Sequence, residues 1–278
     1  MEWYKQSLLK QVVSKLFVSG LLMVTIYARV GHVSAVPLVI CTIGIPCTAD
    51  GGTTSVSGAI YPSLGAAAHF AVLGATAATN SGSTMLTNDL GVSPGSSCTG
   101  FSAPCTDGSG TLAGTIHLAD AAAMQAQANV ANAYTFAETQ ACTTTFAPIT
   151  DIGGMTLTSG VYCFPSSSAV TGTLTLDAQN NPTAVFIFKI GSTLITASES
   201  KVVLINRAQP SKVFWQVGSS ATLGTTTSFA GSIMALTDIT AMTAATSSCG
   251  LYALHGAITL DSNIIQTCVL PSCAFSSD

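Results

Sequence analysis

The sequence predicts a mainly β protein, an irregular β-solenoid (β-helix) with one long α-helix packed alongside. Pairs of Thr separated by an apolar residue recur in the second half of the chain, as in Thr156-Leu157-Thr158 and Thr173-Leu174-Thr175. Because alternate side chains of a strand point to opposite faces, the Leu would enter a core and the Thr would stand outward. Strongly apolar segments separate these pairs, and Gly, Asn, Ser or Pro breaks most of the segments apart.

Two kinds of strand are therefore expected to alternate after Pro148. The apolar strands are expected at residues 161–164, 185–188, 202–205, 213–215 and 233–236. The Thr-bearing strands are expected at 156–158, 173–175, 193–196, 220–224, 238–241 and 257–260. This alternation favours a coil around a narrow core, with each turn stacked on the last. No strict repeat length emerges, so a β-sandwich with a similar number of strands stays open as the alternative.

One long helix is expected at residues 117–140, which are rich in Ala and contain neither Gly nor Pro. The spacing of Met124, Ala128, Ala131 and Tyr134 predicts that these residues form one face of it. A stripe of small residues would let the helix lie close along the side of the stacked strands.

The composition limits the possible functions. Of the 278 residues, 48% are hydrophobic and only 7% are charged, against about 25% charged in typical soluble domains. Eight basic residues and a formal net charge of −4 argue against nucleic acid as a partner. Catalysis on polysaccharides needs paired carboxylates or a calcium site with Arg or Lys nearby. The carboxylates after the N-terminal region are scattered singly along the chain. We therefore expect a protein that is not an enzyme and has no cofactor or metal site.

The N-terminus has the features of a secretory signal. Lys5, Lys10 and Lys15 precede an apolar stretch at 16–28, and Val33-Ser34-Ala35 resembles a cleavage site. An uncleaved signal anchor is the alternative. After cleavage we expect a secreted, extracellular monomer without stable membrane insertion. The expected segments are a signal peptide (1–35), an irregular extension (36–62), a solenoid domain (63–265) with a cap loop (98–110), and a C-terminal tail (266–278).

Nine cysteines fit a secreted chain that is crosslinked by disulfides. The pairs expected from their spacing are Cys41–Cys47, Cys98–Cys105 and Cys142–Cys163. Zinc is the competing explanation, but the chain has neither a CxxC motif nor a nearby His cluster. Because nine is odd, one thiol stays free or pairs with another molecule.

Several long stretches resemble the microbial ice-binding (antifreeze) protein family. These stretches are 70–91, 151–164, 185–193, 213–236 and 253–263, which span most of the chain after the signal. The resemblance implies a right-handed discontinuous solenoid of triangular section, with the last turns stacked against the first and a helix along one side. It also implies one flat face that binds ice, no catalytic residues and no cofactor. Residues 98–110 fall where many members carry a capping subdomain.

The candidate ice-binding residues are the hydroxyl-bearing ones of the Thr strands. They are Thr156, Thr158, Thr173, Thr175, Thr193, Ser220, Thr222, Thr240 and Thr259. Stacked strands would present methyls and hydroxyls at regular spacing, and an uncharged array of this kind suits ordered water. Ile195 and Met242 stand on the candidate surface where the family often has small residues or Thr.

The resulting hypothesis is a protein that adsorbs to the surface of ice crystals and inhibits their growth and recrystallisation. A secreted adhesin or polysaccharide-binding solenoid is the alternative, and exposed aromatic residues are one way in which it could bind sugars. The aromatics Phe186, Phe188, Phe214 and Trp215 lie in strongly apolar segments, where packing in the core is the better interpretation.

Overall fold

The computed structural model describes residues 17–18, 21–22 and 61–268. The chain forms two compact units, Met1–Gly58 and Ala59–Asp278. In the first, strands β1 (Phe17–Val18) and β2 (Leu21–Leu22) pair in antiparallel register. The expected signal cleavage site, the extension up to residue 60, the Cys41–Cys47 pair and the tail beyond Cys268 lie outside the described residues. The second unit, described below, contains the solenoid.

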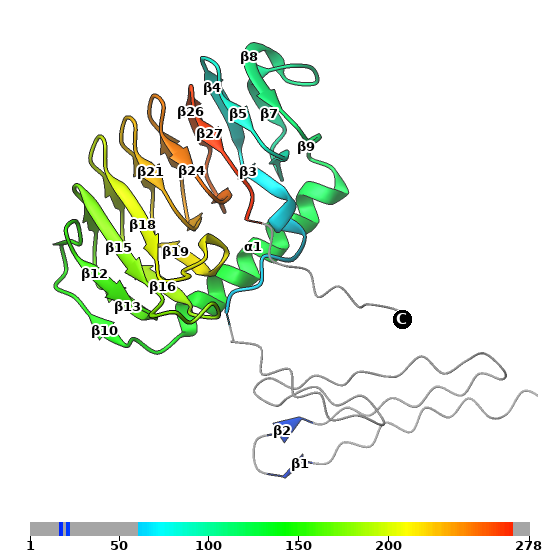
Figure 1. Ribbon diagram of the computed structural model, residues 1–278. Coiled ribbons are helices and arrows are strands. Elements are labelled where there is room, and N and C mark those ends of the chain that lie inside the picture. Colours follow the sequence, from blue (N-terminus) through cyan, green and yellow to red (C-terminus); the bar gives the residue numbers. More distant parts are fainter. Residues whose placement is uncertain (1–16, 19–20, 23–60, 269–278) are drawn as a thin grey trace, which may run out of the picture. The chain divides into compact units, whose positions relative to one another are not determined.

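The strands of the second unit form three faces that run along the coil (Figure 1). Face 1 contains, in spatial order, β10 (Thr144–Thr145), β13 (Gly160–Phe164), β16 (Phe186–Ile190), β19 (Val213–Val217), β22 (Ser232–Ala235), β25 (Leu251–Ala253), β3 (Phe70–Gly74), β6 (Asp89–Val92) and β9 (Ile116–Leu118). Face 2 contains β11 (Thr150–Asp151), β14 (Ser168–Val170), β17 (Leu194–Thr196), β20 (Ala221–Leu223), β23 (Ile239–Ala241), β26 (Ile258–Asp261), β4 (Ala77–Ser81) and β7 (Ser97–Phe101).

Face 3 contains β12 (Thr156–Thr158), β15 (Thr173–Asp177), β18 (Lys201–Ile205), β21 (Ser228–Phe229), β24 (Thr246–Ser247), β27 (Ile264–Ile265), β5 (Met85–Leu86) and β8 (Thr106–Leu112). Strand β8 also pairs with β7 and so joins faces 2 and 3. We call one turn of the coil, with a strand on each face, a rung. The mainly β solenoid with a helix alongside, expected from the sequence, is confirmed, and the β-sandwich alternative is wrong.

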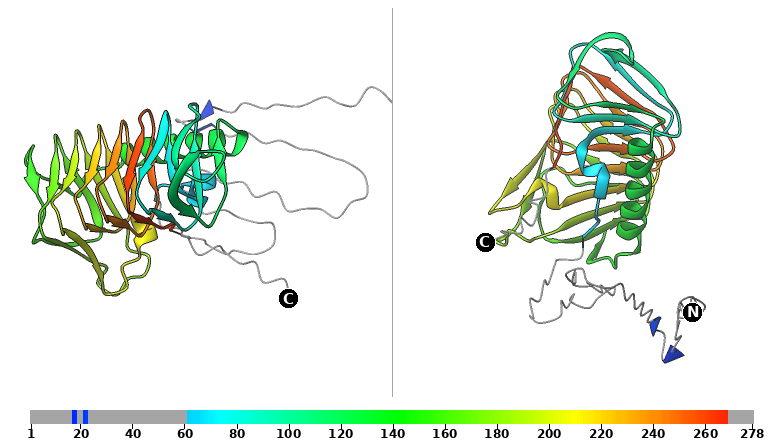
Figure 2. Two further views of the ribbon diagram at one scale, coloured as in Figure 1. Left: turned by 90° about the horizontal axis from the view of Figure 1, so that it is seen from above. Right: turned by 90° about the vertical axis from the view of Figure 1, so that its right-hand side faces the viewer.

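The spatial order of the rungs departs from the chain order at one place. Strands β25, β26 and β27 of the last rung pair in parallel with β3, β4 and β5 of the first. We call this boundary between the last and first rungs the seam. Figure 2 shows the last rung, coloured red, stacked directly beside the first, coloured cyan. Residues from the two ends of the solenoid sequence therefore meet inside the stack and not at its ends.

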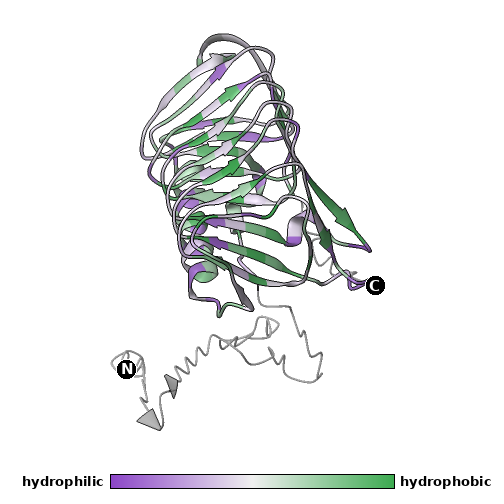
Figure 3. Ribbon diagram, turned by 90° about the vertical axis from the view of Figure 1, so that its left-hand side faces the viewer, coloured by the Kyte–Doolittle hydropathy of each residue, from purple (hydrophilic) through white to green (hydrophobic). Residues whose placement is uncertain are grey.

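The interior of the coil is narrow and aromatic. Tyr162, Phe188 and Trp215 occupy the same register position in adjacent strands of face 1. The rings of Phe188 and Trp215 stack with centroids 3.9 Å apart, and Trp215 Nε1 donates a hydrogen bond to the Ala230 carbonyl. Many hydrophobic residues lie within the strands, as the colouring in Figure 3 shows. Stacked rings fill a cross-section that has room for few side chains per rung.

Helix α1 (Ala121–Thr139) runs along face 1 and packs beside the short helix η1 (Gly65–His69) (Figure 2). It is shorter than expected, because Ile116–Leu118 belongs to β9 and Asp120 caps the helix by accepting a hydrogen bond from Ala123 N. A second short helix, η2 (Pro210–Lys212), precedes β19. No helix among the described residues has the length and apolar character needed to cross a membrane.

The face of α1 that packs on the sheet differs from the expected one. Its buried residues are Ala123, Ala126, Val130, Ala133, Tyr134 and Ala137. Of the expected set only Tyr134 is buried, whereas Met124 is 62% exposed. Ala occurs on both sides of this helix, so the sequence carries little periodicity to choose between two neighbouring faces. Small residues do allow the close packing that was expected.

Three disulfides lie in the described part of the chain. Cys98–Cys105 and Cys142–Cys163 confirm the pairs predicted from the sequence, and Cys249–Cys268 joins the two ends of the last rung. The expected cap loop at 98–110 is partly wrong, since it contains parts of β7 and β8. Gly100 has a φ of +84° and packs against the Asn80 carbonyl, so a Gly-rich segment can form strands here because it lets backbones approach closely.

Candidate functional site: a threonine array on face 2

Five threonines lie side by side on successive strands of face 2. They are Thr222, Thr240, Thr259, Thr79 and Thr99, called here the threonine column. Their chain neighbours point inward: in β20, for example, Ala221 and Leu223 are buried on either side of Thr222. At about 4.8 Å between strands, the column extends for about 19 Å. It presents a methyl and a hydroxyl group on each of its five strands.

Neighbouring hydroxyls along face 2 are hydrogen-bonded to one another. Thr79 Oγ1 donates to Thr259 Oγ1 at 3.3 Å within the column. Beside the column, Thr193 Oγ1 donates to Ser167 Oγ at 2.8 Å. Ser220 Oγ and Thr237 Oγ1 are likewise 2.7 Å apart. These contacts restrict the rotation of the side chains, so that the surface is ordered before it meets a partner.

The carboxylates of Asp238, beside face 2, and of Asp151, within it, accept hydrogen bonds from the main chain of the protein. The Asp238 carboxylate accepts a hydrogen bond from Ala257 N at 2.8 Å. At the far rung, Asp151 accepts from Gly153 N and Thr171 N. Partial burial raises the pKa of Asp151, but the hydrogen bonds from Thr171 and Gly153 outweigh this, and the pKa lies below its usual value of 3.8. The five column positions themselves carry no charge.

The structure divides the nine sequence-predicted residues between two faces. Thr222, Thr240 and Thr259 lie on face 2, and Thr193 and Ser220 lie at its edge, directly before β17 and β20. Thr156, Thr158, Thr173 and Thr175 lie on face 3, in β12 and β15. There the register places Thr173 beside Lys201 and Thr175 beside Val203. A cation and exposed aliphatic side chains therefore interrupt the hydroxyl pattern of face 3 within one rung.

The sequence profile of the family described as "Ice-binding-like" matches residues 72–266, which include all five threonines of the column. The chain belongs to this family. An ice-binding protein from Nostoc sp. (strain HG1) is 46% identical over 214 residues, which cover 77% of each chain.

Solved structures show the same fold. The crystal structure of the ice-binding protein from the Antarctic ascomycete Antarctomyces psychrotrophicus has a TM-score of 0.71 and 34% identity, covering 76% of this chain and 100% of that one. An ice binding protein from an Antarctic biological consortium has a TM-score of 0.69 and 41% identity, covering 76% of this chain and 93% of that one. The similarity therefore extends over the solenoid of this member of the ice-binding-like family.

Two residues of the column, Thr79 and Thr99, were missed by sequence reasoning. Thr79 lies in β4 beside the buried Ala78, an alternation that is visible in the sequence. Thr99 lies in the segment expected to be a loop. What the sequence could not show is that β4 pairs with β26, whose partner residues lie 180 positions away.

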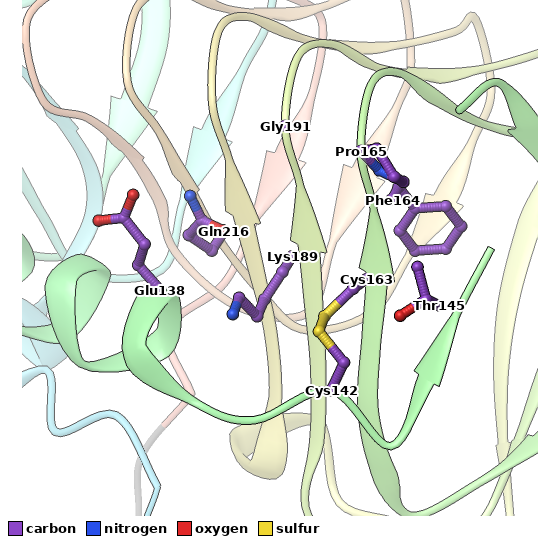
Figure 4. Close-up of a pocket in the computed structure, with 9 residues that line it drawn as sticks. All are labelled: Glu138, Cys142, Thr145, Cys163, Phe164, Pro165, Lys189, Gly191 and Gln216. Carbon is purple, nitrogen blue, oxygen red and sulfur yellow. A yellow bond between two sulfur atoms is a disulfide. The ribbon is translucent and has the colours of Figure 1, made fainter. Parts of the chain in front are cut away.

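A separate concave region lies at the end of α1 (Figure 4). Its volume is about 370 Å³, and the Cys142–Cys163 disulfide forms part of its wall. Lys189 points toward it, but Lys189 Nζ already donates a hydrogen bond to the Gln140 carbonyl at 2.7 Å. The cation thus serves to anchor the chain as it leaves the helix.

The aromatic residues on which a sugar-binding groove could have been built are in the core. Phe186, Phe188, Phe214 and Trp215 are each no more than 1% exposed. The interpretation of these four as packing residues is confirmed. Phe214 packs in the cluster that contains the buried residues of α1. Tyr61 stacks on Phe214, and Lys212 Nζ lies 3.4 Å from the centre of the Tyr61 ring.

Proposed function

We propose that the chain binds ice through the threonine column of face 2, and that its adsorption inhibits the growth and recrystallisation of ice. The single observation that carries this proposal is the register of five threonines on adjacent strands. Membership of the ice-binding-like family and the similar proteins that are named for ice binding support it.

The physical argument rests on order. Ice and liquid water have the same chemistry, so a binder must recognise a regular arrangement of water molecules. Threonine suits this task because its branched Cβ restricts χ1 and holds the hydroxyl in few positions. Each contact is weak, but a rigid backbone limits the entropy lost when many such contacts form together. Strongly hydrated charges would work against it, and the column positions have none.

The broader assignment follows from the same features. We propose that the protein is secreted after removal of residues 1–35, acts outside the cell as a monomer, and binds ice without catalysis. The three disulfides of the described part fit an oxidising compartment. A surface with few charged groups also suits a partner that consists of water rather than nucleic acid or a charged polymer.

The experiment is a comparison of one substitution on each of two faces. Thr240→Tyr places a bulky ring within the column, between Thr222 and Thr259, and Thr173→Tyr places the same ring on face 3. Both proteins are mixed with growing ice, and the fraction incorporated is measured together with inhibition of recrystallisation. We expect Thr240→Tyr to lose most incorporation and Thr173→Tyr to behave like the parent protein.

The opposite pattern would move the ice-binding site to face 3. If the folded parent protein is excluded from ice, the proposed function is wrong. Circular dichroism of both variants serves as the control for folding, since both positions lie on the outer surface of the coil.

A further inference from the structure

The threonine column crosses the seam. Thr222, Thr240 and Thr259 belong to consecutive rungs at the C-terminal end, whereas Thr79 and Thr99 belong to the N-terminal rungs. Strands joined by short corners hold their neighbours in register through the chain itself. Between Thr259 and Thr79 no such short connection exists, because 180 residues separate them. Register at this one place must come from contacts.

One buried residue of the last rung contacts both of the neighbouring rungs. Asn263 is fully buried between β26 and β27. Its Nδ2 donates hydrogen bonds to the carbonyls of Met242 at 2.8 Å and Ala245 at 3.0 Å, both in the preceding rung. Its Oδ1 accepts from Asp261 N at 2.7 Å. The side chain thus fixes the last rung against the rung that carries Thr240.

The main chain of Asn263 makes the contact across the seam. Its N–H donates to Thr84 Oγ1 at 3.0 Å, and its carbonyl accepts from Met85 N at 2.8 Å. Thr84 is 1% exposed, so this hydroxyl lies in the interior rather than on a face. It stands at the corner between β4, which carries Thr79, and β5. Thr84 and Asn263 therefore meet close to the point where the column crosses from one end of the chain to the other.

Register matters here more than the strength of attachment. The ladder between β26 and β4 and the packing of α1 on both sides also hold the seam together. A slip by one residue along such a ladder would turn every outward side chain inward. The buried hydrogen bond from Asn263 N to Thr84 Oγ1 opposes such a slip. The slip would leave the Asn263 N–H without an acceptor, which costs free energy in a site that water does not reach.

We propose that Thr84 and Asn263 are positioning residues, which hold the two parts of the threonine column in one register so that ice meets a single array of five threonines. This inference rests on the proposed function. It adds that Thr79 and Thr99 bind ice together with the three C-terminal threonines, and that a hydroxyl inside the coil controls how well they do so.

The test compares three substitutions of buried threonines. Thr84→Val removes the hydroxyl and keeps the shape, whereas Thr84→Ser keeps the hydroxyl. Thr227→Val is the matched control, because Thr227 is also 1% exposed and hydrogen-bonded but lies away from the seam. We expect a several-fold loss of incorporation into ice for Thr84→Val, and values near the parent for Thr84→Ser and Thr227→Val. Equal losses for both Val variants would overturn the positioning role.

A second readout separates positioning from general destabilisation. Thr79→Tyr is introduced into the parent protein and into Thr84→Val. In the parent we expect a several-fold loss of incorporation; in the Thr84→Val background we expect little further loss, because Thr79 is already out of register. Additive losses in the two backgrounds would contradict the proposal.

If Thr84→Val fails to fold, surface variants alone test whether the ice-binding array extends across the seam. Thr79→Tyr and Thr99→Tyr are compared with Thr240→Tyr. If all three lose incorporation, the array extends across the seam as proposed. If only Thr240→Tyr loses it, ice binding on face 2 stands and the inference is wrong. If none of the three does, both the inference and the choice of face 2 are wrong.

Discussion

Ile195 lies beside Thr222 in parallel register on face 2, at the position where a sixth threonine would extend the column. Half of the Ile195 side chain is exposed, at 50%. Beyond it the same position is occupied by Ala169 and then Asp151. The column therefore stops at Thr222 for a reason of sequence and not of backbone geometry, since the strands continue in register.

Ile195→Thr should strengthen ice binding. The substitution adds a hydroxyl at a position already held in the right register, and Thr is close to Ile in shape at Cβ. We expect a measurable increase in recrystallisation inhibition at equal protein concentration. Val203→Thr on face 3, another exposed aliphatic residue, is the control and should change nothing. An unchanged or weaker Ile195→Thr protein would show that the apolar residue itself contributes to the contact with ice.

Trp215→Ala should destabilise the coil by about 3–5 kcal/mol. Trp215 is fully buried, stacks on Phe188 and donates to the Ala230 carbonyl. Its removal leaves a cavity in a core that has few other side chains to fill it. Thermal unfolding measures the effect, with Met124→Ala on the exposed side of α1 as a control expected to stay within about 0.5 kcal/mol. Similar values for the two variants would contradict this account of the core.

The cap of α1 should make stability depend on pH in the acid range. The hydrogen bond from Ala123 N lowers the pKa of Asp120 below its ordinary value of 3.8, with a further contribution from His117. Because the folded-state pKa is depressed, the stabilisation is fully present above the unfolded pKa and is lost as the pH falls through the folded value. Thermal unfolding followed from about pH 5 down to about pH 2 should therefore show a smaller decline for Asp120→Asn than for the parent.

Asp120→Ala provides the second part of that experiment. Loss of the cap should cost about 1 kcal/mol at neutral pH, whereas Asn can still accept the hydrogen bond from Ala123 N. If Asp120→Asn and Asp120→Ala were equally unstable at neutral pH, the role of the side chain as a helix cap would be wrong.

Replacing Cys142 and Cys163 by Ser should lower the free energy of unfolding by about 2–4 kcal/mol. The disulfide closes a loop across 21 positions of the chain and ties the segment after α1 to face 1. It lies away from the threonine column, so incorporation into ice at low temperature should be unchanged. A loss of ice binding in the folded double variant would show that this end of the coil belongs to the site.

The sequence predicts the stacked strands well because the alternation of Leu and Thr is local. In β15, for instance, Leu174 and Leu176 are buried just as the pattern requires. The Cys98–Cys105 and Cys142–Cys163 pairs were also predictable, since close spacing restricts the choice of partners. The buried face of α1 was not, because Ala at positions such as 126 and 128 gives either side of the helix the same character.

The division of the candidates between two faces could not be predicted either. Thr175 and Thr222 both lie in strands where Thr alternates with buried apolar residues, so the local pattern is the same. The number of residues in each corner decides which face a strand joins. Pairing across the seam is harder still, because no local pattern links Thr79 to Thr259. The family resemblance implied such a pairing, whereas the choice of residues that meet there came from the structure.

The seam also has a consequence for how the chain reaches its native state. In an ordinary solenoid each turn can add to the one made before it, so folding can follow synthesis. Here β3, β4 and β5 are made first, yet their neighbours on one side are β25, β26 and β27, which are made last. That side of the first rung stays unpaired until nearly the whole domain has been synthesised. A chain still being synthesised cannot form the complete threonine column. A protein that lacks its last rung would expose two sheet edges with unpaired N–H and C=O groups, and its column would be interrupted.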